Sequence, residues 1–166
     1  MQTSSLLKYI VVAILSVVAL NASAKAPDTP ALQVAKQFCA WHNKNQLDRR
    51  YRSLVTPSLQ DKIRKVELLE EKFHKKHPNE KGPLGDGIPF RGLPDWGTCR
   101  VGNIRKTANT ATIHVLYKYS RTELASDHLI LKKELGQWKI DDVLYGGEMN
   151  RSLSRELQIV TTQKWE

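Results

Sequence analysis

The sequence predicts an α+β protein in which helices come first and an antiparallel sheet follows. In the first half, apolar residues recur at the three- and four-residue spacing of amphipathic helices. From residue 99 onward, the spacing changes to the two-residue alternation of half-buried strands. A segregated order of this kind is typical of an antiparallel sheet with helices packed against one face.

The first 24 residues have the layout of a secretory signal peptide. Lys8 supplies a positive start, residues 9–20 form an apolar core, and residues 22–24 are a small-residue cleavage site. An apolar run of twelve residues is too short to cross a hydrocarbon core, which needs about 20. We therefore expect cleavage after Ala24, a periplasmic location without a stable membrane anchor, and one globular domain over residues 25–166.

The exported chain is expected to be basic. Its leader carries one lysine and no acidic residue, so 25 of the 26 basic and all 17 acidic side chains remain, for a net charge of +8. An exported protein seldom meets nucleic acid, so we expect its acidic partners to be lipid head groups, cell-wall polymers or a protein surface. The alternative is that the charge only keeps the protein soluble.

Cys39 and Cys99 are the only cysteines of the chain. An even number of cysteines in an oxidising compartment favours a disulfide between them. Two buried free thiols are the alternative, and Cys39 beside His42 is a weaker candidate for a nucleophile. No zinc site is expected, because neither cysteine has a second ligand at finger-like spacing.

Three helices are expected in the first half of the chain. Thr29 and Thr56 each precede a proline, which together mark a helix start. The apolar spacing predicts long helices over residues 30–45 and 57–76, with a short helix near residues 47–54 between them.

The second half predicts four strands and a terminal helix. The alternating segments are residues 99–106, 111–119, 129–135 and those from 138 onward. Gly136 and Gln137 are expected to form a type II′ turn between the last two strands, since glycine stands first. A short helix is expected to open at Ser152.

Residues 78–97 are expected to form one long loop between the helices and the sheet. They hold five of the nine glycines and four of the seven prolines. A loop of about 20 residues in a small domain is uncommon, and is usually functional when it is ordered. We predict a partner-binding site there, formed by Ile88, Phe90, Arg91, Leu93, Asp95 and Trp96. The alternative is that Phe90 and Trp96 plug the open end of the sheet as core.

Several segments, taken in order, resemble a family of small exported bacterial proteins of unknown function. Residues 38–42 (Phe-Cys-Ala-Trp-His) are similar to its Phe-Tyr-x-Trp-Tyr helix motif. Residues 86–90 and 95–96 resemble its Asp-Pro-Phe and Asp-Trp segment. Residues 138–143 resemble its Trp-Arg-Ile-x-x-Ile final strand, and residues 152–153 its terminal Ser-Leu helix.

The resemblance implies a nuclear-transport-factor-like (cystatin-like) roll, with a curved four-stranded sheet around N-terminal helices and a short C-terminal helix. Immunity proteins of secreted cell-wall amidases are broadly similar. We therefore expect a non-enzymatic protein-binding role, as an inhibitor or immunity protein against a secreted cell-wall-degrading effector, for instance an acidic hydrolase. Because the fold also hosts a conical pocket, the alternatives are a small-molecule-binding protein or an acid–base enzyme using Tyr117, His114, Tyr145 and Asp142.

No catalytic, metal or cofactor site is expected from the motifs. Residues 85–87 are half of a nucleotide fingerprint, with no preceding strand and no third glycine. His74 and His77 lie about one helical turn apart, but two lysines separate them and no carboxylate has ligand spacing. Asp141 and Asp142 are consecutive strand residues, whose side chains point to opposite faces.

Overall fold

The computed structural model describes residues 29–85, 87–92, 97–122, 124–146 and 151–165. The expected signal peptide and its cleavage site lie outside these residues.

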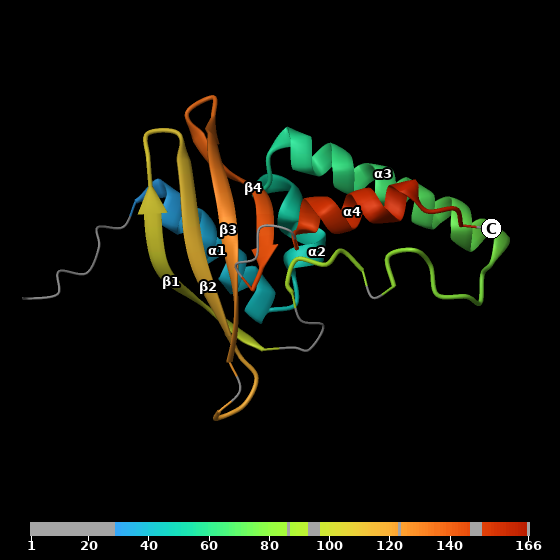
Figure 1. Ribbon diagram of the computed structural model, residues 1–166, viewed down its shortest axis with the longest axis horizontal. Helices are drawn as coiled ribbons and strands as arrows, with labels where there is room; N and C mark the ends of the chain where they lie inside the picture. The colour runs from blue at the N-terminus through green and yellow to red at the C-terminus, as the bar shows by residue number, and fades with distance from the viewer. Residues whose placement is uncertain (1–28, 86, 93–96, 123, 147–150, 166) are drawn as a thin grey trace, which may run out of the picture.

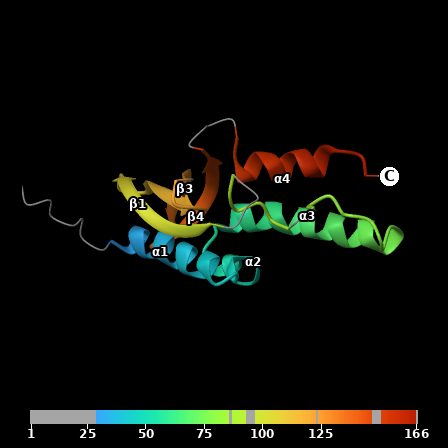
Figure 2. The ribbon, with the colours of Figure 1, turned by 90° about the horizontal axis from the view of Figure 1, so that it is seen from below.

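Four antiparallel strands form an open sheet in which the strand order follows the chain. They are β1 (Thr98–Lys106), β2 (Thr110–Lys118), β3 (Leu124–Glu134) and β4 (Gln137–Tyr145). The predicted α+β class with a four-stranded antiparallel sheet is therefore confirmed. A register shift between Val101 and Ile104 marks an irregularity in β1, and Figure 2 shows this strand bending along its length.

The helical elements are α1 (Pro30–Asn43), α2 (Leu47–Arg50), the 3₁₀ turn η1 (Tyr51–Ser53), α3 (Pro57–Lys76) and α4 (Leu153–Thr162). The two long helices, α1 and α3, begin where the threonine–proline pairs predict. The hydroxyl of Thr29 accepts a hydrogen bond from the N–H of Leu32, and that of Thr56 from the N–H of Leu59. Each cap satisfies an N–H group that the first helical turn leaves unpaired.

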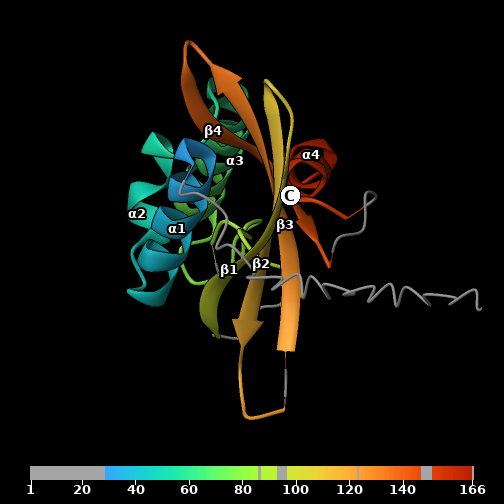
Figure 3. The same cartoon turned by 90° about the vertical axis from the view of Figure 1, so that its left-hand side faces the viewer.

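The helices lie on both sides of the sheet, not against one face as the sequence pattern predicts. Helix α1 lies on one face, in contact with β1, β2 and β4, while α4 contacts β4 from the other side (Figures 2 and 3). Helices α3 and α4 pack side by side and extend beyond β4 along the long axis of the molecule (Figure 1). The core between α1, α3 and the sheet includes the fully buried Phe38, Ile63, Ile113, Leu129 and Ile140.

A disulfide between Cys39 and Cys99 ties α1 to the start of β1, as the sequence predicts. Asn43 strengthens the same connection. Its side-chain oxygen accepts from the Cys99 N–H at 2.7 Å, and its side-chain amide donates to the Cys99 carbonyl at 3.0 Å. The end of α1 is therefore fixed to the first strand by covalent and hydrogen bonds.

The last hairpin turn differs from the prediction. Glu134 pairs with Gln137, so the two turn residues are Leu135 and Gly136, with φ angles of 48° and 80°. Two positive φ angles define a type I′ turn, which matches the twist of the flanking strands better than other turns do. Leu135 adopts this backbone although the left-handed region costs an L-residue about 1–2 kcal/mol. Strand pairing thus outweighs the local preference.

We expect reduction of the disulfide to lower the free energy of unfolding by about 4 kcal/mol, because the bond closes a 60-residue separation in the unfolded chain. In a domain of this size, the melting temperature should fall by about 10 °C. Calorimetry with and without reductant measures this change. The Cys39→Ala/Cys99→Ala variant should melt like the reduced protein, and equal melting of oxidised and reduced protein would contradict the expectation.

Candidate functional site

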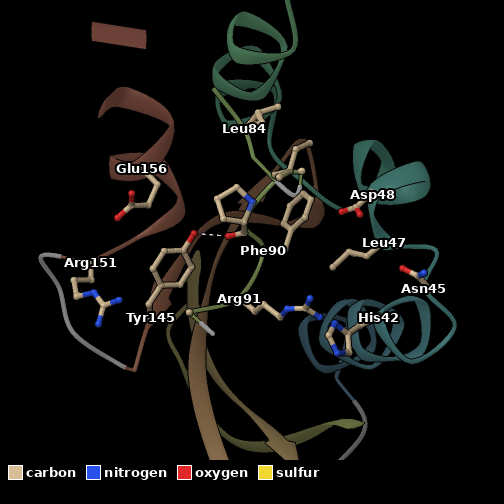
Figure 4. A pocket seen from close by; sticks show the side chains of 14 residues that line it. His42, Asn45, Leu47, Asp48, Leu84, Phe90, Arg91, Tyr145, Arg151 and Glu156 are labelled. Carbon is tan, nitrogen blue, oxygen red and sulfur yellow. Dashed lines mark hydrogen bonds between the residues drawn. The ribbon is translucent and has the colours of Figure 1, made fainter. Parts of the chain in front are cut away.

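A pocket of about 410 Å³ opens beside the described part of the long loop. The end of α1 and the start of α2 form one wall, while β4 and α4 form the other, with the loop between them (Figure 4). The lining residues are His42, Asn45, Leu47, Asp48, Leu84, Gly87, Ile88, Pro89, Phe90, Arg91, Gly92, Tyr145, Arg151 and Glu156. The pocket thus joins three segments that are distant in the sequence.

Three of the predicted partner-binding residues line this pocket, namely Ile88, Phe90 and Arg91. The other three, Leu93, Asp95 and Trp96, lie outside the described residues.

Phe90 is part of the hydrophobic core. Its side chain is only 4% exposed, and its ring meets Phe38 edge-on at 6.5 Å and packs against Tyr51 at 5.3 Å between ring centroids. This position agrees with the alternative interpretation of Phe90 as a core residue. The phenyl ring therefore anchors the loop to the helices.

Asp127 of β3 holds the loop against the sheet. Its carboxylate accepts from the N–H of Gly92 and from the N–H of Gly146, both at 2.9 Å. Gly92 lies so close to the sheet that a Cβ there would be 2.8 Å from the Cβ of Tyr145 and 3.0 Å from an oxygen of Asp127. Only glycine fits this approach of loop to strand.

Two further hydrogen bonds fix the course of the loop. At its start, the N–H of Leu84 donates to the Glu70 carboxylate of α3 at 2.7 Å. Farther along, the hydroxyl of Tyr145 donates to the carbonyl of Pro89, as Figure 4 shows. Burial raises the pKa of Tyr145 well above its ordinary value, so this hydroxyl remains a donor at neutral pH.

The α1 side of the pocket carries three ionisable groups. The ring of His42 is buried and donates through Nε2 to the carbonyl of Gly97 at 2.8 Å. Burial lowers the pKa of His42, and the hydrogen bond to Gly97 acts in the opposite direction. Burial also raises the pKa of Asp48, while the positive charge of Arg91 lowers it. The guanidinium of Arg91 points toward His42 in Figure 4.

The α4 side adds a second pair of opposite charges, Arg151 and Glu156. Between the two charged sides lie the apolar groups of Leu84, Ile88 and Pro89. The pocket can therefore contact an apolar body in its middle and charged groups at either end.

The four residues considered for acid–base chemistry are not brought together. Tyr145 lines the pocket, whereas His114 lies on the opposite face of the sheet from α1, stacked on His128 with ring centroids 4.9 Å apart. Tyr117 is buried, and its ring centroid lies 5.2 Å from that of His42. The carboxylate of Asp142 accepts from the N–H groups of Val143 and Ser154, and so caps α4.

The neighbouring Asp141 has a structural role of a different kind. Its carboxylate pairs with Lys132 at 2.6 Å and accepts from the hydroxyl of Thr56 at 3.0 Å.

Within the described parts of the chain, no group of three or more His, Cys, Asp and Glu side chains is arranged to hold a metal ion.

Sequence reasoning missed Asp48, Asp127, Arg151 and Glu156. Asp127 carries a signal in principle, since it lies at an inward position of β3, where an acidic residue needs partners. The other three have none, because they are polar residues in exposed-looking segments.

Comparisons of the chain with protein-family models, with curated proteins and with solved structures found no match. Among the residues that the structure describes, no helix is both long and apolar enough to span a bilayer. The function is therefore inferred from the site and from the sequence.

We expect the stability of the protein to fall as the pH drops below 6.5. Burial lowers the pKa of His42 and of His128. Between the ordinary histidine pKa and these lower values, the unfolded chain binds more protons than the folded protein, so the free energy of unfolding decreases with falling pH. Asp48 and Asp127 act in the opposite sense, because burial raises their pKa above 3.8.

The variant His42→Gln isolates one of these contributions, because a glutamine amide can still donate to Gly97. Urea midpoints of both proteins at pH 7.5 and at about pH 5.5 measure the difference. The wild-type midpoint should drop more than that of the variant. Equal pH dependence in the two proteins would show that His42 is not protected from protonation.

Proposed function

We propose that the protein is a non-enzymatic, exported binding protein that takes a small amphipathic molecule into the pocket beside residues 84–92. The observation that carries this proposal is a pocket of about 410 Å³ whose loop wall is held in place. Ligand sites of this kind measure about 300–1,000 Å³ and combine apolar walls with a few polar groups.

The walls indicate the chemistry of the ligand. Leu84, Ile88 and Pro89 offer apolar contact, and the charged groups lie at the two ends. Arg151 is exposed and suits an anionic group of the ligand. A molecule with an apolar body and a terminal acidic group satisfies both features.

Three hydrogen bonds support pre-organisation of the site. They join Leu84 to Glu70, Pro89 to Tyr145 and Gly92 to Asp127. A wall that is already ordered costs little conformational entropy when a ligand binds. The order of this wall therefore supports tight binding of a ligand that fits the pocket.

The finer fold and the location belong to the same proposal. We propose a nuclear-transport-factor-like roll for residues 25–166, supported by the contacts of α1 with β1, β2 and β4. The layout of residues 1–24 supports export to the periplasm.

A protein-binding role, as an inhibitor or immunity protein against a secreted hydrolase, is the second candidate. Ile88 and Arg91 are only partly buried at the pocket, so a partner can reach them. The net charge of +8 of the expected mature chain would speed encounter with an acidic partner. If the protein binds such a partner, the partner inserts a side chain into the pocket beside residues 84–92.

Titration with 1-anilinonaphthalene-8-sulfonate, an apolar aromatic anion that fluoresces when it is bound, tests the proposal. The variant Arg151→Glu should weaken binding at least about fivefold, because a carboxylate replaces the proposed anion partner. Arg155→Glu is the matched control, since Arg155 lies on α4 but does not line the pocket. Its affinity should stay within about twofold of wild type.

Two results would count against the ligand proposal. One is equal affinity of the Arg151→Glu and Arg155→Glu variants. The other is unchanged affinity of Ile88→Trp, whose indole should fill the pocket. If Ile88→Trp instead abolishes inhibition of a secreted hydrolase while binding of the dye persists, the protein-binding role is favoured.

A further inference from the structure

A second pocket, of about 390 Å³, lies at the far end of the α3–α4 pair. We call this region the α3–α4 tip, and its residues are Leu69, Lys72, Phe73, Lys75, Lys76, His77 and Trp165. Three apolar side chains and four basic ones meet there. The composition differs from that of the first pocket, which carries charges of both signs.

Aromatic contacts build the floor of the tip. The ring of Phe73 stacks on His77 at 4.7 Å and meets Trp165 edge-on at 6.5 Å between ring centroids. The indole N–H of Trp165 donates to the carbonyl of Val160 at 2.8 Å, which fixes the ring beyond the end of α4. Phe73 and Trp165 nevertheless remain partly exposed.

Exposed ammonium groups lie around this floor. Lys72 and Lys76 are exposed beside the aromatic rings, and Lys164 is exposed next to Trp165 in the chain. Among the described residues nearby, Glu70 pairs with His74 at 3.0 Å, Glu71 with Lys75 at 2.8 Å and Glu80 with His77 at 3.2 Å. Lys72 and Lys76 are therefore exposed ammonium groups at the tip that form no ion pair with a described carboxylate.

The tip is also placed where an extended surface can reach it. In Figures 1 and 2, the ends of α3 and α4 lie at one extreme of the long axis, away from the sheet. Just beyond the end of α3, the chain turns back toward the body of the molecule (Figure 1). A flat partner can therefore contact the tip without meeting the sheet.

We propose that the α3–α4 tip docks reversibly on an anionic lipid surface. Indole rings favour the boundary between head groups and acyl chains. Lysines contact apolar surface with their stems while the ammonium groups stay among the head groups. A basic residue near an anionic bilayer strengthens binding about fivefold. The exposed lysines and the aromatic floor fit such a boundary together, whereas a purely polar anion would use only the charges.

Co-sedimentation with vesicles tests this proposal. The protein should bind vesicles of phosphatidylglycerol and phosphatidylethanolamine and should not bind phosphatidylcholine vesicles. Lys72→Glu/Lys76→Glu should lower the partition coefficient at least about tenfold. Lys118→Glu/Lys133→Glu makes the same change in net charge at exposed positions on the sheet, and should lower it much less. Trp165→Ala should weaken binding severalfold without reversing any charge.

Absence of binding to the anionic vesicles would overturn the proposal. So would equal losses in the two double variants, because net charge alone would then explain the binding. Complete release by soluble glycerol phosphate would point to a site for a small anion in place of a bilayer. Arg151→Glu should bind vesicles like wild type, which keeps this result separate from that of the first pocket.

Discussion

The position of the long loop depends on one buried carboxylate. Asp127 is 2% exposed, and its two oxygens accept from the N–H groups of Gly92 and Gly146. Burial raises the pKa of this group, while the two N–H donors lower it. A hydrogen bond to a charged group contributes about 1.5–3 kcal/mol, but desolvation offsets much of that gain. The carboxylate therefore specifies where the loop lies more than it adds to stability.

The remaining contacts fix the two ends of the loop and its centre. Helix α3 holds the start through Glu70, and Phe90 fills the core at the middle. At the end, the Cys39–Cys99 disulfide and the bond from His42 to Gly97 connect α1 to the first strand. The described residues of this glycine- and proline-rich segment thus acquire a defined course, which gives the first pocket its wall.

Patterns confined to a few neighbouring residues allowed most of the fold to be predicted. The caps at Thr29 and Thr56, the two-residue alternation of the strands and the cysteine pair depend on local spacing or on a single partner. Strand β3 begins at Leu124, earlier than the predicted residue 129. The sequence Leu-Ala-Ser-Asp-His lacks alternation, because an acidic residue occupies an inward position.

The site was harder to predict than the fold, because its groups come from distant segments. The partners of Asp127 are 35 residues before it and 19 residues after it, and both are backbone groups. The residue types do not reveal which backbone N–H groups will donate to a carboxylate. Only the two glycines indicate that the backbone can approach Asp127 closely. Arg151 and Glu156 reach the pocket only because α4 packs beside β4.

Hydrogen exchange at the amide of Gly92 tests the central role of Asp127 most directly. In the wild-type protein this amide should be protected, and Asp127→Ala should speed its exchange by at least about tenfold. Asp142→Ala is the matched control, because it removes a carboxylate that caps α4 and does not contact the loop. Fast exchange of Gly92 in the wild type, or the same protection in Asp127→Ala, would contradict the account.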